Sequence, residues 1–130
     1  MRTMNDIVTD TCVLIVEDEP LIRVDAIDMV ADEGFAVCDA PNAAKALVIL
    51  ESRDDIGILF TDIDMPGEMD GLDLARTVRK RWPHIAIIIV SGHTRLTDAD
   101  VPNGGMFFSK PYLRATMLKA LHRADIRTRG

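Results

Sequence analysis

The sequence lacks most of the features of a disulfide-stapled, zinc-binding or membrane-inserted protein. Its 130 residues include only two cysteines, Cys12 and Cys38, and neither belongs to a CxxC pair. Each lies in an apolar run, so we interpret both as buried free thiols in a reducing compartment. No apolar stretch approaches the ~18 residues of a membrane span, and residues 1–11 contain no apolar segment of signal-peptide length. These absences predict a cytoplasmic protein.

An excess of positive charge is also missing. Lysine and arginine number 15 against 21 aspartates and glutamates, which gives a formal net charge of −6. Nucleic acids and anionic membranes repel such a chain, so neither is an expected partner. Hydrophobic residues make up 48% and charged residues 28% of the sequence, as in a chain that buries its own core. The length predicts one domain, which we assign to residues 11–127 after a loose tail at 1–10.

Short apolar runs alternate with longer amphipathic segments along the chain. The runs predict five strands, at residues 12–16, 35–40, 56–61, 85–90 and 106–109. Apolar residues at helical spacing predict four helices, with these stripes: Ile22, Ala26, Met29 and Val30; Ala43, Ala46, Leu47 and Leu50; Leu72, Ala75, Val78 and Trp82; Leu113, Met117, Leu121 and Ala124. This alternation predicts a parallel sheet with helices on both faces.

Polar residues follow the ends of four predicted strands. They are Glu17, Asp18 and Glu19 after the first strand, Asp62 after the third, Ser91 and Gly92 after the fourth, and Lys110 and Pro111 after the fifth. Because the carboxyl ends of parallel strands meet at one edge of a sheet, we expect these side chains to converge. Clustered carboxylates repel one another unless a cation joins them, and oxygen-only ligands suit Mg²⁺. An acidic cup with a lysine and a serine beside it is suited to phosphoryl transfer onto a carboxylate.

With these residues in view, the chain resembles the receiver domain of bacterial two-component response regulators. The resemblance extends from Thr11 to Arg127 and rests on VEDEP at 16–20, LFTDIDMPGEMDG at 59–71, SG at 91–92 and SKP at 109–111. It implies an α/β, flavodoxin-like (βα)5 fold, doubly wound around a five-stranded parallel sheet in the order 2-1-3-4-5. It also implies a single-domain response regulator with no output domain, which is a signalling switch and not an enzyme.

The same resemblance implies roles in phosphoryl transfer for particular residues. Asp62 takes the position of the phosphoacceptor, and Lys110 and Ser91 take the positions that hold the phosphoryl group. Phe107 takes the position of an aromatic switch. Strand alternation places Phe108 on the same face of the sheet as Lys110 and Phe107 on the opposite face, which favours Phe108 as the core residue.

For the metal, the resemblance implies Mg²⁺ as the cofactor. Asp18 and Asp62 would bind it directly, together with the backbone carbonyl of Asp64, and Glu17 would act through water. Helix capping by Glu17 and Asp18 is a second interpretation that is compatible with metal binding. His93 and the side chain of Asp64 occupy positions that tune the loss of the aspartyl phosphate in this family.

The remaining acids of the 59–71 stretch are interpreted as structural. Glu68 and Asp70 are solvated turn residues, and Asp70 is placed to cap the helix that begins near Leu72. Asp64 is expected to direct its side chain towards the mouth of the site. Met65, Met69, Gly67 and Gly71 are interpreted as architecture.

The implied partners are a histidine kinase or a histidine phosphotransfer protein as donor, and an unidentified protein as downstream target. One alternative is a haloacid-dehalogenase-like phosphatase, because Asp62-Ile63-Asp64 forms a DxD motif. In those enzymes the motif follows the first strand and the acidic pair comes late, which is the reverse of the order here. A second alternative is a scaffold that binds without phosphorylation, and the complete set of site residues argues against it.

The sequence departs from the family pattern between Ser91 and Lys110. The pattern predicts a shortened fourth helix, because Pro102 and two glycines follow soon after a short helical pattern at 96–101. We therefore predict a mobile or remodelled segment at 96–105, and no family-typical dimer through this region.

Overall fold

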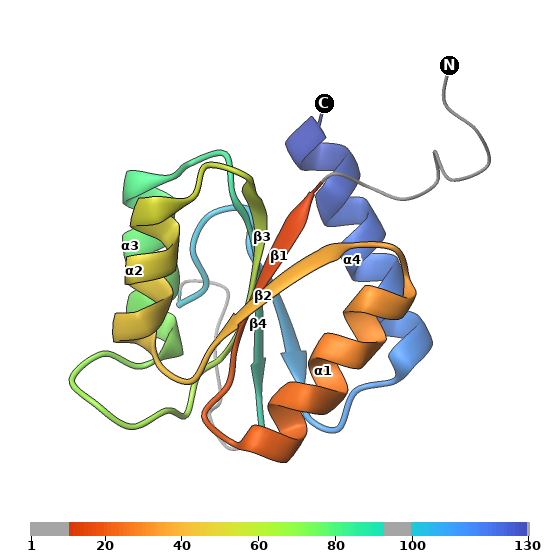
Figure 1. The fold of residues 1–130 in the computed structure, drawn as a ribbon, viewed down its shortest axis with the longest axis horizontal. Coiled ribbons are helices and arrows are strands. Elements are labelled where there is room, and N and C mark those ends of the chain that lie inside the picture. Colours follow the sequence, from red (N-terminus) through yellow and green to blue (C-terminus); the bar gives the residue numbers. More distant parts are fainter. Residues whose placement is uncertain (1–10, 93–99, 130) are drawn as a thin grey trace.

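Five parallel strands form one sheet in the order β2-β1-β3-β4-β5 (Figure 1). The structure is a computed structural model, and it describes residues 11–92 and 100–129. The strands are β1 (Cys12–Val16), β2 (Ala36–Ala40), β3 (Ile56–Asp62), β4 (Ala86–Ser91) and β5 (Met106–Ser109). The fold class and the strand order predicted from the sequence are confirmed, and each strand lies within one or two residues of its predicted range.

Within the described residues, four helices cover the two faces of this sheet. They are α1 (Pro20–Asp32), α2 (Ala43–Ser52), α3 (Gly71–Arg81) and α4 (Arg114–Arg129). Helices α2 and α3 lie on one face, and α1 and α4 lie on the other (Figure 1). No helix among these residues is long and apolar enough to span a membrane.

Two helix starts are fixed by side-chain caps. Asn42 accepts a hydrogen bond from the N–H of Lys45 over 2.9 Å, as its position before α2 predicts. Asp70 accepts from the N–H of Asp73, and the side chain of Asp73 accepts from the N–H of Asp70, which forms a capping box at α3. The predicted capping role of Asp70 is confirmed.

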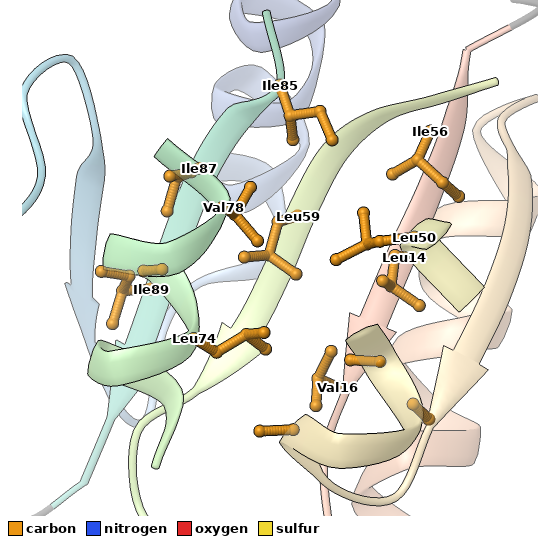
Figure 2. Packing of buried hydrophobic residues seen from close by; sticks show 14 of the residues in the cluster. Leu14, Val16, Leu50, Ile56, Leu59, Leu74, Val78, Ile85, Ile87 and Ile89 are labelled. Atoms are coloured by element: carbon orange, nitrogen blue, oxygen red, sulfur yellow. The ribbon is translucent and has the colours of Figure 1, made fainter. Parts of the chain in front are cut away.

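The hydrophobic core has two parts because successive strand residues point to opposite faces. On the α2 and α3 side, Leu14 and Leu59 of the sheet face Leu50, Leu74 and Val78 of the helices (Figure 2). Fully burying one such leucine side chain contributes about 1.5–3 kcal/mol. The central strands β1, β3 and β4 are buried on both faces, so their carboxyl ends are held firmly in place.

The last helix differs from its predicted stripe at one residue. Leu113 precedes α4 and is 74% exposed, whereas Met117, Leu121 and Ala124 are buried as predicted. The four residues share a helical spacing in the sequence, but the helix begins at Arg114, so Leu113 lies outside the buried stripe.

The connection between β4 and β5 is irregular where the structure describes it. Residues 100–105 form turns and contain no helix, with the N–H of Gly105 donating to the carbonyl of Pro102 over 2.8 Å. The predicted short helix at 96–101 lies mostly outside the described residues. The prediction of mobility at 96–105 stays a prediction.

The two cysteines are free thiols that lie next to each other; the prediction that both are buried is confirmed for Cys12 and wrong for Cys38, which lies on the partly exposed strand β2. The Sγ atoms of Cys12 on β1 and Cys38 on β2 are 3.6 Å apart. Cys12 is fully buried and Cys38 is half-buried. The hydrogen bond between the thiols lowers the pKa of Cys12 and raises that of Cys38.

Candidate functional site at the carboxyl edge of the sheet

Glu17 is the first residue beyond β1, and both its backbone and its carboxylate are hydrogen-bonded. Its N–H donates to the carbonyl of Ala40 over 3.1 Å, which extends the β1–β2 ladder by one residue. Its carboxylate accepts hydrogen bonds from the N–H of Glu19 at 3.0 Å and from Nζ of Lys110 at 3.1 Å. Glu17 is 4% exposed, whereas Asp18 is half-buried and Glu19 is exposed.

Asp62 is the last residue of β3 and is paired with Val90 of β4. Its side chain is buried, although the loop that follows is exposed from Pro66 to Glu68. The loop returns to the end of β3, where the N–H of Gly71 donates to the carbonyl of Ile63 over 3.0 Å. The Asp62 end of β3 therefore lies next to the start of α3.

Lys110 reaches this edge from β5. Its N–H donates to the carbonyl of Ser91 over 2.9 Å, and the peptide bond to Pro111 is cis. The ammonium lies 3.1 Å from Oε1 of Glu17 and 3.5 Å from Oδ2 of Asp62. One lysine thus joins Glu17, directly after β1, to Asp62, the last residue of β3, as the convergence of the strand ends predicts.

The electrostatics of the site favour a cation. Burial raises the pKa of Asp62 and the pKa of Glu17, and the attraction of Lys110 only partly opposes this effect. Burial disfavours the charged form of Lys110 as well, but its hydrogen bond to Glu17 and the charges of Asp62 and Glu17 outweigh burial and raise its pKa. A single ammonium therefore compensates the buried carboxylates incompletely.

Two further observations fit a hard divalent ion such as Mg²⁺. Carboxylate oxygens of Glu17, Asp18 and Asp62 lie within 4.8 Å of one another. Oδ1 of Asp62 is buried and has no hydrogen-bond partner among the described residues. A buried carboxylate oxygen without a partner is costly, and coordination to a cation would satisfy it. The donor set contains only oxygen, which suits Mg²⁺ better than zinc or copper.

Ser91 and Asp64 form a contact at the mouth of the site. Oγ of Ser91 donates to Oδ2 of Asp64 over 3.0 Å. Ser91 is 2% exposed and Asp64 is exposed, so the bond runs from the buried end of β4 towards the surface. The expected direction of the Asp64 side chain is confirmed, and its contact with Ser91 is an addition.

A cleft of about 630 Å³ opens over Glu17, Asp18, Asp62 and Lys110. Its charged part is lined by the acids and Lys110, and its apolar part by Ile22, Ala26, Phe60 and Tyr112. The Tyr112 ring contacts Phe60 edge-on with centroids 6.3 Å apart, and burial raises the pKa of the Tyr112 phenol. Tyr112 was missed in the sequence because no motif includes it.

The two phenylalanines of β5 lie on opposite faces, as strand alternation predicts. Phe107 packs on the α2 and α3 side, with Val101 nearby in the same cluster, and Phe108 packs on the α1 and α4 side. Both are partly buried, so burial does not single out Phe108 as the core residue. His93 lies outside the described residues.

A family model named response regulator receiver domain matches residues 13–122 of the chain. The chain belongs to this family. Among solved structures, a response regulator receiver protein from Sinorhizobium medicae WSM419 superposes with a TM-score of 0.82 at 29% identity, covering 91% of this chain and 96% of that one. The receiver domain of the hybrid histidine kinase CckA gives a TM-score of 0.74 at 27% identity, covering 87% and 97%.

Curated relatives of this receiver domain include both kinases and response regulators. The sensor kinase CckA of Brucella abortus is 34% identical over 92% of this chain, which spans 13% of that protein. A putative NtrX-like response regulator of Rickettsia bellii is 35% identical over 86% of this chain, which spans 24% of that protein. The receiver domain thus corresponds to a quarter or less of these relatives.

Two residues with a structural part in the site were not recognised in the sequence. Gly71 was assigned only to architecture, yet a Cβ atom on it would lie 1.7 Å from the backbone oxygen of Asp62. Arg23 was not singled out, although its guanidinium contacts the backbone of Glu17. Both contacts form between parts of the chain that come together only in the folded structure, so no local sequence pattern predicts them.

Proposed function

We propose that this receiver domain is a phosphoacceptor that takes a phosphoryl group on Asp62 and thereby changes its binding to a protein partner. The observation that carries the proposal is the position of the Lys110 ammonium, 3.1 Å from Glu17 and 3.5 Å from Asp62. It sets one positive charge beside a buried carboxylate that has a free oxygen. Residues 11–127 form the receiver unit in this proposal.

The reaction is an in-line displacement at phosphorus. A carboxylate oxygen of Asp62 attacks the phosphorus of a phosphohistidine on a histidine kinase or a histidine phosphotransfer protein. The new O–P bond forms as the P–N bond breaks, and the electron pair of that bond stays on the imidazole nitrogen. Lys110 neutralises charge on the phosphoryl oxygens, and its ion pair with Asp62 favours the ionised carboxylate, which is the form that attacks phosphorus.

Mg²⁺ is the expected cofactor of this transfer. Asp18 and Asp62 would hold it directly, with the backbone carbonyl of Asp64 as a third ligand and Glu17 acting through water. The ion would neutralise charge on the transferred group when bound. Its support here is the cluster of three carboxylates and the unpartnered Oδ1 of Asp62.

The switch begins with the hydroxyl of Ser91. In the structure this group donates to Asp64, so binding a phosphoryl oxygen requires it to exchange one acceptor for another. The aspartyl phosphate adds roughly −1.5 to −2 charges, by analogy with other phosphorylated side chains. We propose that Phe107 turns inward with this change. A differential free energy of about 5 kcal/mol is sufficient to take such an equilibrium from mostly off to mostly on.

The kinase or phosphotransfer protein would dock over exposed aliphatic side chains beside the cleft. Leu21 is 81% exposed at the start of α1, Ile22 lines the cleft, and Leu113 is exposed directly after Tyr112. Exposed aliphatic residues around a polar centre suit the docking of a protein partner that brings its phosphohistidine to the cleft.

The proposal is tested by incubation with Mg²⁺ and acetyl phosphate, followed by intact-mass measurement. The wild type is expected to gain the mass of one phosphoryl group, and Asp62→Asn is expected to gain none. Asp54→Asn serves as the matched control, because Asp54 is an exposed acid before β3, at the opposite edge of the sheet. A wild type that gains no phosphoryl mass, or an Asp62→Asn variant that gains as much, would overturn the proposal.

A further inference from the structure

Arg23 of α1 is held between the turn after β1 and the neighbouring strand β2. Its Nη1 donates to the backbone oxygen of Glu17 over 2.7 Å, and its Nε lies 3.1 Å from Oδ2 of Asp39. The arginine side chain is 20% exposed. A planar guanidinium that bonds in two directions has one orientation, so it fixes the distance between its two partners. Arg23 therefore ties the carbonyl of Glu17 to β2.

The bonded carbonyl belongs to the peptide unit between Glu17 and Asp18. Because that unit is planar, the direction of its oxygen also sets the direction in which the chain enters Asp18. The N–H of Glu17 is held separately by the carbonyl of Ala40, at 3.1 Å. Both backbone polar groups of Glu17 are thus hydrogen-bonded. Arg23 holds the carbonyl, which belongs to the peptide that leads to Asp18.

The side chains of Glu17 and Asp18 differ in how far the backbone alone sets their direction. The carboxylate of Glu17 has partners of its own, the N–H of Glu19 and the ammonium of Lys110. Asp18 makes no side-chain hydrogen bond or ion pair with any residue that the structure describes. Its carboxylate oxygen nevertheless lies within 4.8 Å of those of Glu17 and Asp62. With no side-chain partner of its own among these residues, Asp18 depends on the backbone for the direction of its side chain, and Arg23 holds the peptide that precedes it.

We propose that Arg23 is a positioning residue of the divalent-cation site, which directs the Asp18 carboxylate towards Asp62 without touching the ion. The inference rests on the proposed function, since it assumes that the acids bind Mg²⁺. The positive charge of Arg23 is compensated by Asp39, so the effect acts through orientation and not through repulsion of the ion. Groups that orient metal ligands affect metal affinity strongly even when they make no bond to the metal.

The test is a titration of the protein with MgCl₂ in a calorimeter, with no phosphodonor present. Arg23→Met is expected to bind Mg²⁺ about tenfold more weakly than the wild type. Arg23→Lys keeps the charge and can bond the carbonyl but not both partners, so an intermediate affinity is expected. Asp39→Asn weakens only the outer contact and is expected to cause a smaller loss in the same direction.

Arg81→Met is the matched control. Arg81 also pairs with an acid, Glu51, at 2.8 Å, but it ends α3 on the opposite edge of the sheet from the acids. Its removal is expected to leave the Mg²⁺ affinity unchanged. Thermal unfolding of each variant without Mg²⁺ separates a general loss of stability from a loss of affinity.

Each outcome has a distinct meaning. A tenfold loss in Arg23→Met with partial recovery in Arg23→Lys supports the inference. Equal affinities of the wild type and Arg23→Met, with only the unfolding temperature lowered, overturn it and leave the proposed function intact. If Arg23→Met does not fold, Arg23→Lys and Asp39→Asn decide, and wild-type affinity in both overturns the inference. A wild type that binds no Mg²⁺ overturns the Mg²⁺ part of the proposed function together with this inference.

Discussion

A Cβ atom built on Gly71 would lie 1.7 Å from the backbone oxygen of Asp62. The first residue of α3 is thus packed directly against the peptide of the proposed phosphoacceptor. The same carbonyl of Asp62 accepts a hydrogen bond from the hydroxyl of Thr61 over 2.9 Å. Because the end of β3 is buried in the sheet, its backbone cannot easily move away from a larger residue at position 71.

Gly71→Ala is therefore expected to destabilise the protein by about 2–4 kcal/mol, since the added methyl group must displace backbone atoms. Chemical denaturation with urea measures this loss. Gly92→Ala is the control, because a Cβ atom there would meet only Cβ of Lys110, at an ordinary 3.7 Å. Equal stabilities of the two variants would contradict the packing argument.

Asp62→Asn is expected to stabilise the protein in the absence of Mg²⁺, by on the order of 1 kcal/mol at neutral pH. Burial raises the pKa of Asp62 in the folded state above the ordinary value of 3.8, so the folded state binds this proton more tightly than the unfolded state. The resulting stabilisation is present below the unfolded pKa and is lost as pH rises through the folded pKa. Lys110, whose folded pKa is also raised, loses its contribution only at alkaline pH.

The measurement for this prediction is the unfolding temperature between about pH 4 and pH 8, a range that starts at the ordinary carboxyl pKa. The wild-type curve is expected to fall relative to that of Asp62→Asn as pH increases. Adding Mg²⁺ is expected to recover stability in the wild type only. Parallel curves for the two proteins would show that Asp62 carries no burial penalty.

Ser91→Ala is expected to weaken binding of a phosphoryl mimic such as beryllium fluoride by roughly tenfold, because one hydrogen bond to a charged group is lost. Ser91→Thr keeps the hydroxyl and is the control. Affinity is read from the rise in unfolding temperature with increasing mimic at fixed Mg²⁺. If Ser91→Ala binds the mimic as tightly as the wild type does, Ser91 has no part in holding the phosphoryl group.

Asp70→Ala removes the cap of α3 and is expected to lower the free energy of unfolding by about 1 kcal/mol. The N–H of Asp73 loses its acceptor at 2.9 Å, and the reciprocal bond of the capping box loses its geometry. Lys80→Ala, at an exposed position of the same helix, is the control for helix propensity. Urea unfolding of both variants measures the difference, and an equal effect would show that the capping box contributes nothing.

The parts of the fold that depend on local pattern were predictable from the sequence. β1 is buried on both faces and appears as a continuous apolar run, so it was predicted at its observed bounds. The shorter run of the edge strand β5 was also predicted at its observed bounds, although that strand is only partly buried. The convergence of Glu17, Asp62 and Lys110 follows from parallel topology, since the carboxyl ends of the strands share one edge.

The parts that depend on contacts between distant elements were not predictable. The thiols of Cys12 and Cys38 meet because β1 and β2 pair in a particular register, which the two apolar runs do not specify. In the sequence, Arg23 looks like an ordinary surface residue of an amphipathic helix. Its contact with Asp39 depends on how α1 packs beside β2, which the sequence pattern does not specify. Leu113 fits the helical spacing of α4 but lies before its first turn, and spacing alone does not locate a helix boundary.

The most direct measurement of the central claim locates the phosphoryl group itself. The protein is incubated with Mg²⁺ and acetyl phosphate and then treated with borohydride, which reduces an aspartyl phosphate to homoserine, before peptide mass mapping. The account predicts homoserine at position 62 in the wild type and at no position in Asp62→Asn. Conversion at another acid, such as Asp18 or Asp64, or no conversion at all, would contradict the assignment of Asp62 as the phosphoacceptor.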